Sequence, residues 1–395
     1  MNIKIRCFIC QREKNFRIND FFCPDCEQPM LIVPQESRNP AINKKSSLSL
    51  ERFGDFLPLT TIRSDLSLGE GHTPLLQLRK LKSEQNLWAK MESSNPTLSF
   101  KDRGTVVVVH KALELGFSTI GTVSTGNMAS STAAYGARAG LKTLLLVKKG
   151  SSPGALLSAA IFGPEIIVVD GDYGQLFYQS FELGREFGIY FANSVDPLRI
   201  EGYKLTAFEI CEQLGQTPDF VYVPLSSGGH LLGLYKGFKE FWQAGLSDKI
   251  PVIIGVQAAG CAPVSLAFQE NRIQIDSWPE VRTIAHSISN PKPPAGNLVL
   301  KLLRENNGFL AMVRDEEMIQ AQKLLAELEG IFVQPESAAT LAAYFQLKDK
   351  FHGTSVLVMT GYGLKAAELP SLEPGRYHHS TLEELPAVFK NIIGN

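Results

Sequence analysis

Short β-rich runs alternate with helix-period segments between residues 119 and 359, and this alternation restricts the fold more than any other feature. Parallel strands need a crossover between them, so the alternation is typical of βαβ units. We therefore expect an α/β protein with twisted, mostly parallel sheet covered by helices on both faces. The expected strands are 119–123, 143–147, 166–169, 220–224, 252–256 and 356–359, and the expected helices are 127–139, 174–187, 205–214, 231–243 and 316–329.

Local signals set some boundaries of these elements and leave one segment open. Gly140 and Gly330 each follow an expected helix and are expected to end it. Residues 105–109 are all β-branched, yet they continue without a turn signal into the helix-like segment 110–115. Pattern alone allows helix or strand there. The polar stretch 34–49 lacks apolar periodicity and is interpreted as a linker before a globular region that begins near Leu50.

Four cysteines lie close together at the start of the chain. They form two Cys-x2-Cys pairs separated by twelve residues, namely Cys7, Cys10, Cys23 and Cys26. This spacing allows four thiolates to close tetrahedrally on Zn²⁺. A segment of about 34 residues cannot bury enough apolar surface to fold unaided, and a structural metal supplies the missing stability. We expect a zinc ribbon over residues 1–34. A reduced ribbon without metal and a pair of disulfides are the alternatives.

The charge balance excludes several classes of partner. Lys and Arg number 39 against 40 Asp and Glu, a net charge of −1. No long-range positive field therefore favours nucleic acid or anionic lipid.

The sequence has no pattern typical of a signal peptide or a membrane helix. The first 14 residues lack an apolar run long enough for a signal peptide, and prolines and glycines interrupt the uncharged stretch 250–268. We expect a cytoplasmic protein without a membrane segment.

Lys101 lies in the sequence NPTLSFKDRG, residues 95–104, where it opens an apolar helical segment. A lone lysine is normally a solvated surface charge. The aromatic and hydroxyl residues before this one favour a lysine partly buried at a helix N-terminus, and desolvation lowers the pKa of such an amine. Lys101 is therefore a candidate nucleophile for a carbonyl group, a Schiff-base lysine.

Three polar loops follow expected strands and are candidate ligand sites. The first can bind a carboxylate through hydroxyls and free amides, or can be an ordinary helix cap; it contains Ser124, Thr125 and Asn127. The second is a Ser/Gly loop that can surround a phosphate, made of Ser226, Ser227, Gly228, Gly229 and His230. Thr360 ends a strand in a Thr-Gly-x-Gly turn, where α/β sheets present ligand groups and where a structural threonine is the alternative.

Together these motifs resemble the threonine synthase family of pyridoxal-phosphate enzymes, which has the tryptophan-synthase-β-like fold, or fold type II. The resemblance covers nearly everything after about residue 65 and keeps the family's order. It includes LGEGHTPL at 68–75, STGN at 124–127, NSVDPLRIEG at 193–202, GIFVQPESAA at 330–339 and TGYGLK at 360–365. Some members also carry an N-terminal four-cysteine ribbon. The resemblance implies a large cofactor-binding lobe at 35–90 and 196–395 and a small lobe at 91–195.

The resemblance also implies residue roles. Lys101 would hold pyridoxal 5'-phosphate as a Schiff base and move protons, and Asn127 would bind the cofactor's phenolic oxygen. The loop from Ser226 to His230 would hold the cofactor's phosphate, and Thr360 would face its pyridine nitrogen. Ser124, Thr125 and Asn127 would lie around the substrate carboxylate, and Ser194 and Arg199 would lie near the substrate's phosphate. The open segment 105–109 would be helix.

The implied reaction converts O-phospho-L-homoserine and water to L-threonine and phosphate, in a homodimer that acts on a small amino-acid phosphate. Several positions depart from the family pattern, including Gln334 and Glu336 on either side of Pro335 and the segment 286–291. Leu98 stands where glycine is usual, Met128 where threonine is usual, and His230 replaces an asparagine. The departures leave other functions open: β replacement on O-phosphoserine as in cysteate synthase, a serine or threonine dehydratase, or a non-catalytic regulatory paralogue.

Overall fold

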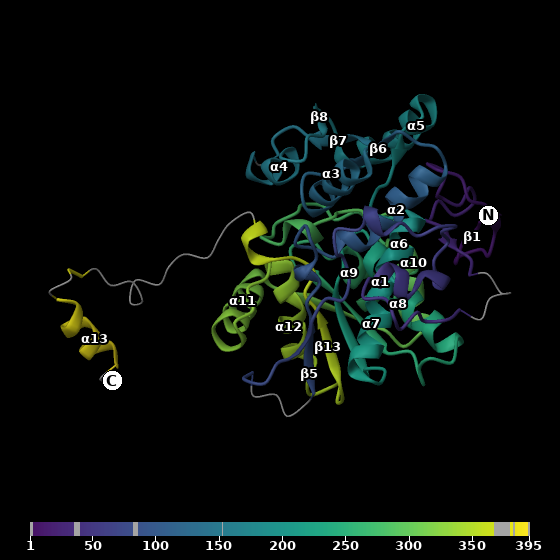
Figure 1. Ribbon diagram of the computed structural model, residues 1–395. Helices are drawn as coiled ribbons and strands as arrows, with labels where there is room; N and C mark the ends of the chain where they lie inside the picture. Colours follow the sequence, from purple (N-terminus) through teal and green to yellow (C-terminus); the bar gives the residue numbers. More distant parts are fainter. Residues whose placement is uncertain are drawn as a thin grey trace.

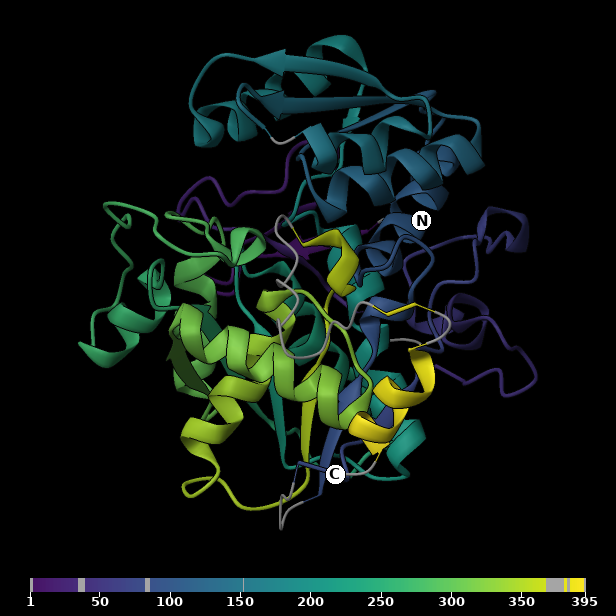
Figure 2. The same cartoon turned by 90° about the vertical axis from the view of Figure 1, so that its left-hand side faces the viewer.

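Three sheets organise the computed structural model, which describes residues 3–34, 40–81, 86–151, 153–366, 380–381 and 384–393. A small antiparallel sheet lies at the N-terminus, and a six-stranded and a four-stranded sheet form the rest. Figure 1 shows the four-stranded sheet with its helices at one end of the molecule and the six-stranded sheet at the other, a separation that Figure 2 shows from the side. Residues 35–39 of the expected linker lie outside the described residues.

The six-stranded sheet has the order β12-β11-β10-β13-β5-β4. Its strands pair in parallel except for β4, which runs antiparallel to β5 at one edge. Successive residues of a strand point to opposite faces. Val221 and Val223 belong to the core that contains α8, whereas Tyr222 belongs to the core that contains α12. Helices therefore cover both faces, as the sequence predicts. The strands are β4 (Leu75–Gln77), β5 (Leu87–Lys90), β10 (Phe220–Pro224), β11 (Val252–Ala258), β12 (Phe309–Val313) and β13 (Ser355–Val358).

The four-stranded sheet is parallel throughout, in the order β8-β7-β6-β9. Its strands are β6 (Thr119–Val123), β7 (Lys142–Lys148), β8 (Glu165–Val169) and β9 (Tyr190–Phe191), joined by α3 (Asn127–Ala139), α4 (Pro153–Ala160) and α5 (Tyr173–Phe187). The other helices are α1 (Ser49–Arg52), α2 (Lys101–Glu114), α6 (Pro197–Tyr203), α7 (Leu205–Leu214), α8 (Gly229–Gln243), α9 (Pro263–Gln269), α10 (Gly296–Glu305), α11 (Asp315–Glu329), α12 (Pro335–Leu347) and α13 (Leu385–Ile393). Short 3-10 helices are η1 (Gly54–Phe56), η2 (Ser64–Leu66), η3 (Glu92–Ser94), η4 (His286–Ile288) and η5 (Gly363–Lys365).

Every strand and helix expected from the sequence is present, with ends that shift by at most two residues. Gly140 and Gly330 adopt φ angles of 68° and 70° at helix ends, which confirms them as C-terminal caps. Residues 105–109 are helical within α2, where their side chains are buried. Tertiary packing overrides their β-branched propensity. Pattern did not reveal β4, β5 and β9, which are two to four residues long, or the five-residue β12.

The N-terminal ribbon packs directly on the body of the protein. Its strands are β1 (Lys4–Arg6), β2 (Glu13–Asn15) and β3 (Leu31–Ile32). Phe21 of the ribbon is buried, and its ring lies 5.6 Å from that of Phe181 on α5. Asn19 donates from Nδ2 to the Ile189 carbonyl at 2.7 Å and accepts from the Phe191 amide at 3.0 Å. The ribbon thus shares the hydrophobic core of the larger body. No helix in the described ranges combines the length and apolarity needed to cross a membrane.

Candidate active site

Lys101 is the first residue of α2, and the chain just before it is held in a tight turn. Asp102 accepts from the Thr97 amide and from the Thr97 hydroxyl, both at 2.6 Å. Burial raises the pKa of Asp102, and these hydrogen bonds oppose that effect because they favour the ionised form. The resulting pKa is about 6. Helix α2 contacts α3, beside the four-stranded sheet, and α6 (Figure 1). The lysine therefore lies between the two larger sheets.

Aromatic rings surround the Lys101 amine. Its Nζ lies 4.2 Å from the centroid of the Phe100 ring and 5.8 Å from that of Tyr203. The Phe100 ring also packs edge-on against Tyr203 at 5.0 Å and stacks on the His230 ring at 3.8 Å with an interplanar angle of 14°. Phe100 therefore joins the loop that precedes Lys101 to the start of α8.

Burial, together with the positive charge of Arg199, lowers the pKa of Lys101 to about 7. Near neutral pH, about half of the amine is then unprotonated. A neutral amine has a free lone pair and can attack a carbonyl carbon. The structure thus provides the chemical condition for the predicted nucleophile.

The carboxyl end of β13 lies beside the lysine. Ser99 forms an antiparallel bridge with Gly361, and the Phe100 amide donates to the Thr360 carbonyl at 3.1 Å. The Thr360 and Ser337 hydroxyls are hydrogen-bonded at 2.9 Å. The structure therefore brings Thr360 next to the Lys101 loop with a hydroxyl that is already oriented by a second one. Sequence reasoning did not single out Ser337.

Asn127 connects the two larger sheets across the site. Its Nδ2 donates to Gln334 Oε1 at 2.8 Å, which links the first residue of α3 to the residue before α12. Ser124 and Thr125 lie in the same loop and are half-buried. The Gly126 amide donates to the Ser124 hydroxyl at 3.3 Å, so the loop is closed locally. The sequence marks Gln334 as a departure from the family pattern without giving it a role, and the structure shows that it orients Asn127.

The backbone of the Ser/Gly loop at the start of α8 is packed closely against neighbouring segments. Gly228 has a φ of +97°, and a Cβ on Gly229 would lie 2.3 Å from the Ser194 carbonyl oxygen. Both positions therefore need glycine. Ser226 and Ser227 are half-buried beside the free amides of the helix N-terminus. Such an arrangement suits a phosphate.

His230 is the unexpected member of this loop. Its side chain is buried, and neither ring nitrogen has a hydrogen-bond partner among the described residues. Burial, with the nearby charges of Lys101 and Arg103, holds the pKa of His230 well below its usual range, so the ring is neutral. Unpartnered buried polar atoms are costly unless a ligand satisfies them. The orphaned ring nitrogens and the glycine loop fit a bound group that carries a phosphate.

Arg199 and Ser194 occupy different positions relative to this loop. Arg199 is fully buried and donates to the Ala192 carbonyl at 2.7 Å and to the hydroxyls of Thr105 and Thr132 at 2.7 and 2.8 Å. Ser194 is half-buried and adjoins Gly229. In this structure Arg199 acts on the site through its charge, whereas Ser194 borders the loop directly.

A buried network of four charges anchors α2 behind Lys101. Arg103 binds Glu92 through Nε and Nη2 at 2.6 and 2.7 Å, and Glu209 through Nη1 and Nη2 at 2.6 and 2.7 Å. Lys90 donates to Glu209 at 2.7 Å. All four side chains are at most 1% exposed. Although burial opposes ionisation, Arg103 and Lys90 hold the pKa of Glu209 well below its usual range. In the sequence, these residues are visible only as single charged residues near apolar segments. That pattern does not show which charge pairs with which.

Leu98 adopts a left-handed conformation with φ of 63°. Glycine reaches this region without strain, and a leucine pays about 1 kcal/mol or more for it. This is the position at which the sequence departs from the glycine of the family pattern. The strain persists because the Leu98 amide donates to Asn95 at 2.7 Å and its carbonyl accepts from Tyr362 at 3.1 Å.

The four ribbon cysteines lie in one cluster. Their sulfur atoms are all within 4.8 Å of one another, and Sγ of Cys10 and Cys23 are 3.6 Å apart. Tetrahedral zinc with Zn–S bonds of about 2.3 Å places sulfurs about 3.8 Å apart. None of the four is in a disulfide. The cluster can therefore hold one metal ion.

Comparison with known proteins agrees with this geometry. The family described as pyridoxal-phosphate dependent enzyme matches residues 66–361, which include Lys101, the Ser/Gly loop and Thr360. The chain belongs to this family. Within it, the chain is 39% identical to the threonine synthase of Methanocaldococcus jannaschii (84% of this chain, 85% of the relative). It is 37% identical to that of Halalkalibacterium halodurans (87% and 94%) and 33% identical to that of Methanosarcina acetivorans (91% and 92%).

Solved structures of the pyridoxal-phosphate family confirm the expected fold. Maize serine racemase superimposes with a TM-score of 0.64 at 19% identity, covering 82% of this chain and 93% of the racemase. The serine racemase of Dictyostelium discoideum superimposes with a TM-score of 0.63 at 20% identity, covering 74% of this chain and 92% of that racemase. The two-sheet architecture with a lysine between the sheets is therefore the fold type II arrangement.

Replacing Glu209 by glutamine is expected to destabilise the protein by about 3–5 kcal/mol, because Arg103 and Lys90 would share one remaining carboxylate in a buried site. Urea unfolding of the apoprotein measures the change. The matched control is Asp170→Asn, which breaks an exposed pair with Lys149 and should cost less than about 1 kcal/mol. Equal effects of the two substitutions would contradict the anchoring role of the network.

The pKa of Lys101 predicts how cofactor uptake by the apoprotein depends on pH. The rate of covalent attachment, followed by visible absorbance, should rise about five-fold from pH 6 to pH 7 and level off above about pH 8, because the neutral amine is the reactive form. Attachment to a free lysine derivative, the control, should keep rising toward pH 10. A protein rate that follows the free lysine would show that Lys101 is not desolvated.

Proposed function

We propose that the protein is a threonine synthase that converts O-phospho-L-homoserine and water to L-threonine and phosphate. The observation that carries the proposal is the match to threonine synthases at 33–39% identity across more than four fifths of the chain. A partly desolvated lysine beside a phosphate-type loop supports it. We propose the same division as the sequence suggests, with a ribbon at 1–34, a large lobe at 35–90 and 196–395 and a small lobe at 91–195, and a homodimer as the assembly.

The residues of the site suit pyridoxal 5'-phosphate. Residues 226–230 would hold its phosphate, Asn127 would bind its phenolic oxygen, and Thr360 would face its pyridine nitrogen. When bound, it supplies an aldehyde for a lysine amine and a ring that accepts electrons from a carbon acid. A neutral Thr360 hydroxyl, oriented by Ser337, would make that ring less electron-withdrawing than a carboxylate partner would.

Lys101 would move protons in this reaction. With a pKa near 7, its Nζ can accept a proton from a substrate carbon and return it without a large change in driving force. Ser124 and Thr125, half-buried in the loop before α3, would bind the substrate carboxylate. Water would add at the β carbon after phosphate leaves the γ carbon. Ser194 borders the Ser/Gly loop and would contact the substrate phosphate.

A second reaction is favoured by two specific observations. His230 places a neutral imidazole where the family pattern has an asparagine, and the Arg199 side chain is fully enclosed by the protein. A site with fewer donors directed at a distal phosphate would suit a shorter substrate. The second candidate is therefore β replacement or elimination on O-phospho-L-serine.

Separate assays with the two phosphorylated amino acids distinguish these reactions. The holoenzyme should release phosphate from O-phospho-L-homoserine and form threonine, and Lys101→Ala should lower the rate by at least about a thousand-fold. Lys142→Ala, on an exposed lysine of β7, is the control and should keep the activity. Phosphate release from O-phospho-L-serine alone would replace threonine synthase by the second candidate.

We also propose that the four cysteines hold a structural Zn²⁺. The purified protein should contain one zinc per chain, and a strong chelator should lower its thermal stability because Phe21 would lose its enclosure. Cys23→Ser should abolish zinc binding, whereas Cys211→Ser, on a buried cysteine of α7, should keep one zinc per chain. Full stability in a zinc-free protein would contradict the structural role.

A further inference from the structure

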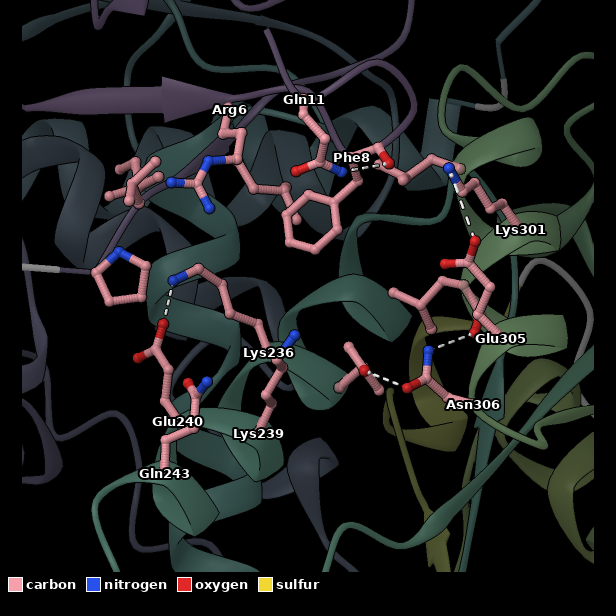
Figure 3. Close-up of a pocket in the computed structure, with 17 residues that line it drawn as sticks. Arg6, Phe8, Gln11, Lys236, Lys239, Glu240, Gln243, Lys301, Glu305 and Asn306 are labelled. Atoms are coloured by element: carbon pink, nitrogen blue, oxygen red, sulfur yellow. Dashed lines mark hydrogen bonds and ion pairs between the residues drawn. The ribbon is translucent and has the colours of Figure 1, made fainter. Parts of the chain in front are cut away.

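A cavity of about 510 Å³ lies between the ribbon and the body, away from the Lys101 site. One wall comes from the ribbon, another from α8 and a third from α10 (Figure 3). Its volume is within the range of small-molecule sites. Nothing in the proposed reaction uses these side chains.

The cavity is rich in cationic donors. Arg6 on β1, Lys236 and Lys239 on α8 and Lys301 on α10 all line it, against the two carboxylates of Glu240 and Glu305. Figure 3 shows the Arg6 guanidinium and the Lys239 ammonium reaching into the same space from the ribbon and from α8. The residues that line the cavity thus include four cations and two carboxylates, and Glu13 and Glu201 outside the lining pair with Arg6 and Lys236.

The cations differ in how far the protein neutralises them. Lys236 binds Glu201 and Glu240, and Arg6 binds Glu13 through Nε at 2.7 Å. Lys301 donates to the Ile9 carbonyl at 3.2 Å and lies 3.7 Å from Glu305. Lys239 has no carboxylate or hydrogen-bond partner within the part of the chain that the structure describes; its Nζ lies 6.0 Å from the Tyr235 ring. This half-buried ammonium is the charge that an anion would neutralise.

The rest of the lining suits an organic body. The Phe8 ring faces the space below Arg6 in Figure 3, and the ribbon adds the apolar side chains Leu31, Ile32 and Val33. Tyr235 is fixed by a 2.6 Å hydrogen bond from its hydroxyl to Asn306. A single inorganic anion would leave most of the volume and all of this apolar wall without contact.

We propose that the cavity between the ribbon, α8 and α10 binds a small organic phosphate, with the phosphate between Arg6 and Lys239 and an apolar or aromatic body against Phe8. Phosphate is favoured over carboxylate because its three oxygens can accept from several converging cations. The site is separate from the predicted cofactor loop, since Lys239 is ten residues along α8 from Gly229, about 15 Å. It needs a folded ribbon, because Arg6 and Phe8 flank the zinc-ligand candidate Cys7.

Calorimetric titration of the zinc-loaded holoenzyme with phenyl phosphate tests the proposal. Binding should be at least about ten-fold weaker in Lys239→Gln and unchanged in the control Lys142→Gln. Inorganic phosphate and benzoate should each bind more weakly than phenyl phosphate to the unaltered protein. Phenyl phosphate binding that Lys239→Gln does not weaken would place the probe at the active site and overturn the proposal, as would benzoate binding equally tightly or no binding at all.

A second measurement uses the unaltered chain. Amine-reactive labelling followed by mass spectrometry should show that phenyl phosphate slows modification of Lys239 several-fold and leaves Lys142 unaffected. Equal labelling of Lys239 with and without the probe would contradict occupancy of the cavity, whatever the variants show.

Discussion

The placement of Lys101 depends on a buried arrangement of two cations and two carboxylates. Arg103 is two residues after Lys101 in α2, and it forms ion pairs with Glu92 before the helix and with Glu209 on α7. Lys90, at the end of β5, donates to Glu209 as well. Charges without solvent are tolerated only when each has close partners. These ion pairs fix the first turn of α2 relative to β5 of the six-stranded sheet and to α7. Because Lys101 is the first residue of α2, its position is fixed as well.

The chemistry of Lys101 depends on a contrast between two buried arginines. Arg103 is neutralised by carboxylates, whereas the hydrogen bonds of Arg199 go to a carbonyl and two hydroxyls. Hydroxyl and carbonyl oxygens satisfy the donors of Arg199 without cancelling its charge. That charge and desolvation together lower the pKa of Lys101 to about 7. One arginine thus anchors the helix and the other tunes the amine.

Sequence reasoning located six of the strands and five of the helices, among them most strands of the two larger sheets, because apolar periodicity is a local property. Residues 105–109 show its limit. Valine and threonine prefer strands, but here they are helical within α2, where their side chains are buried and the helix packs against α3 and α6. The site was predicted through strand–loop–helix junctions, and the structure places Lys101, Thr360 and the Ser/Gly loop around Phe100 and His230. The sequence did not predict roles for Ser337 and Gln334. A hydroxyl or amide residue near a helix start gives the same sequence pattern whether or not its side chain faces a ligand.

By itself, the sequence determined the α/β architecture, the four-cysteine ribbon and the loops that can carry chemistry, because periodicity, spacing and turn residues act over a few positions. Only the tertiary structure decided which charges pair. Glu209 lies 106 residues from Arg103, and Lys239 on α8 meets Arg6 of the ribbon at one cavity. Coulombic and desolvation energies depend on distance in space and on exclusion of water. Neither the distances between these charges nor the exclusion of water from them is fixed until the chain has folded.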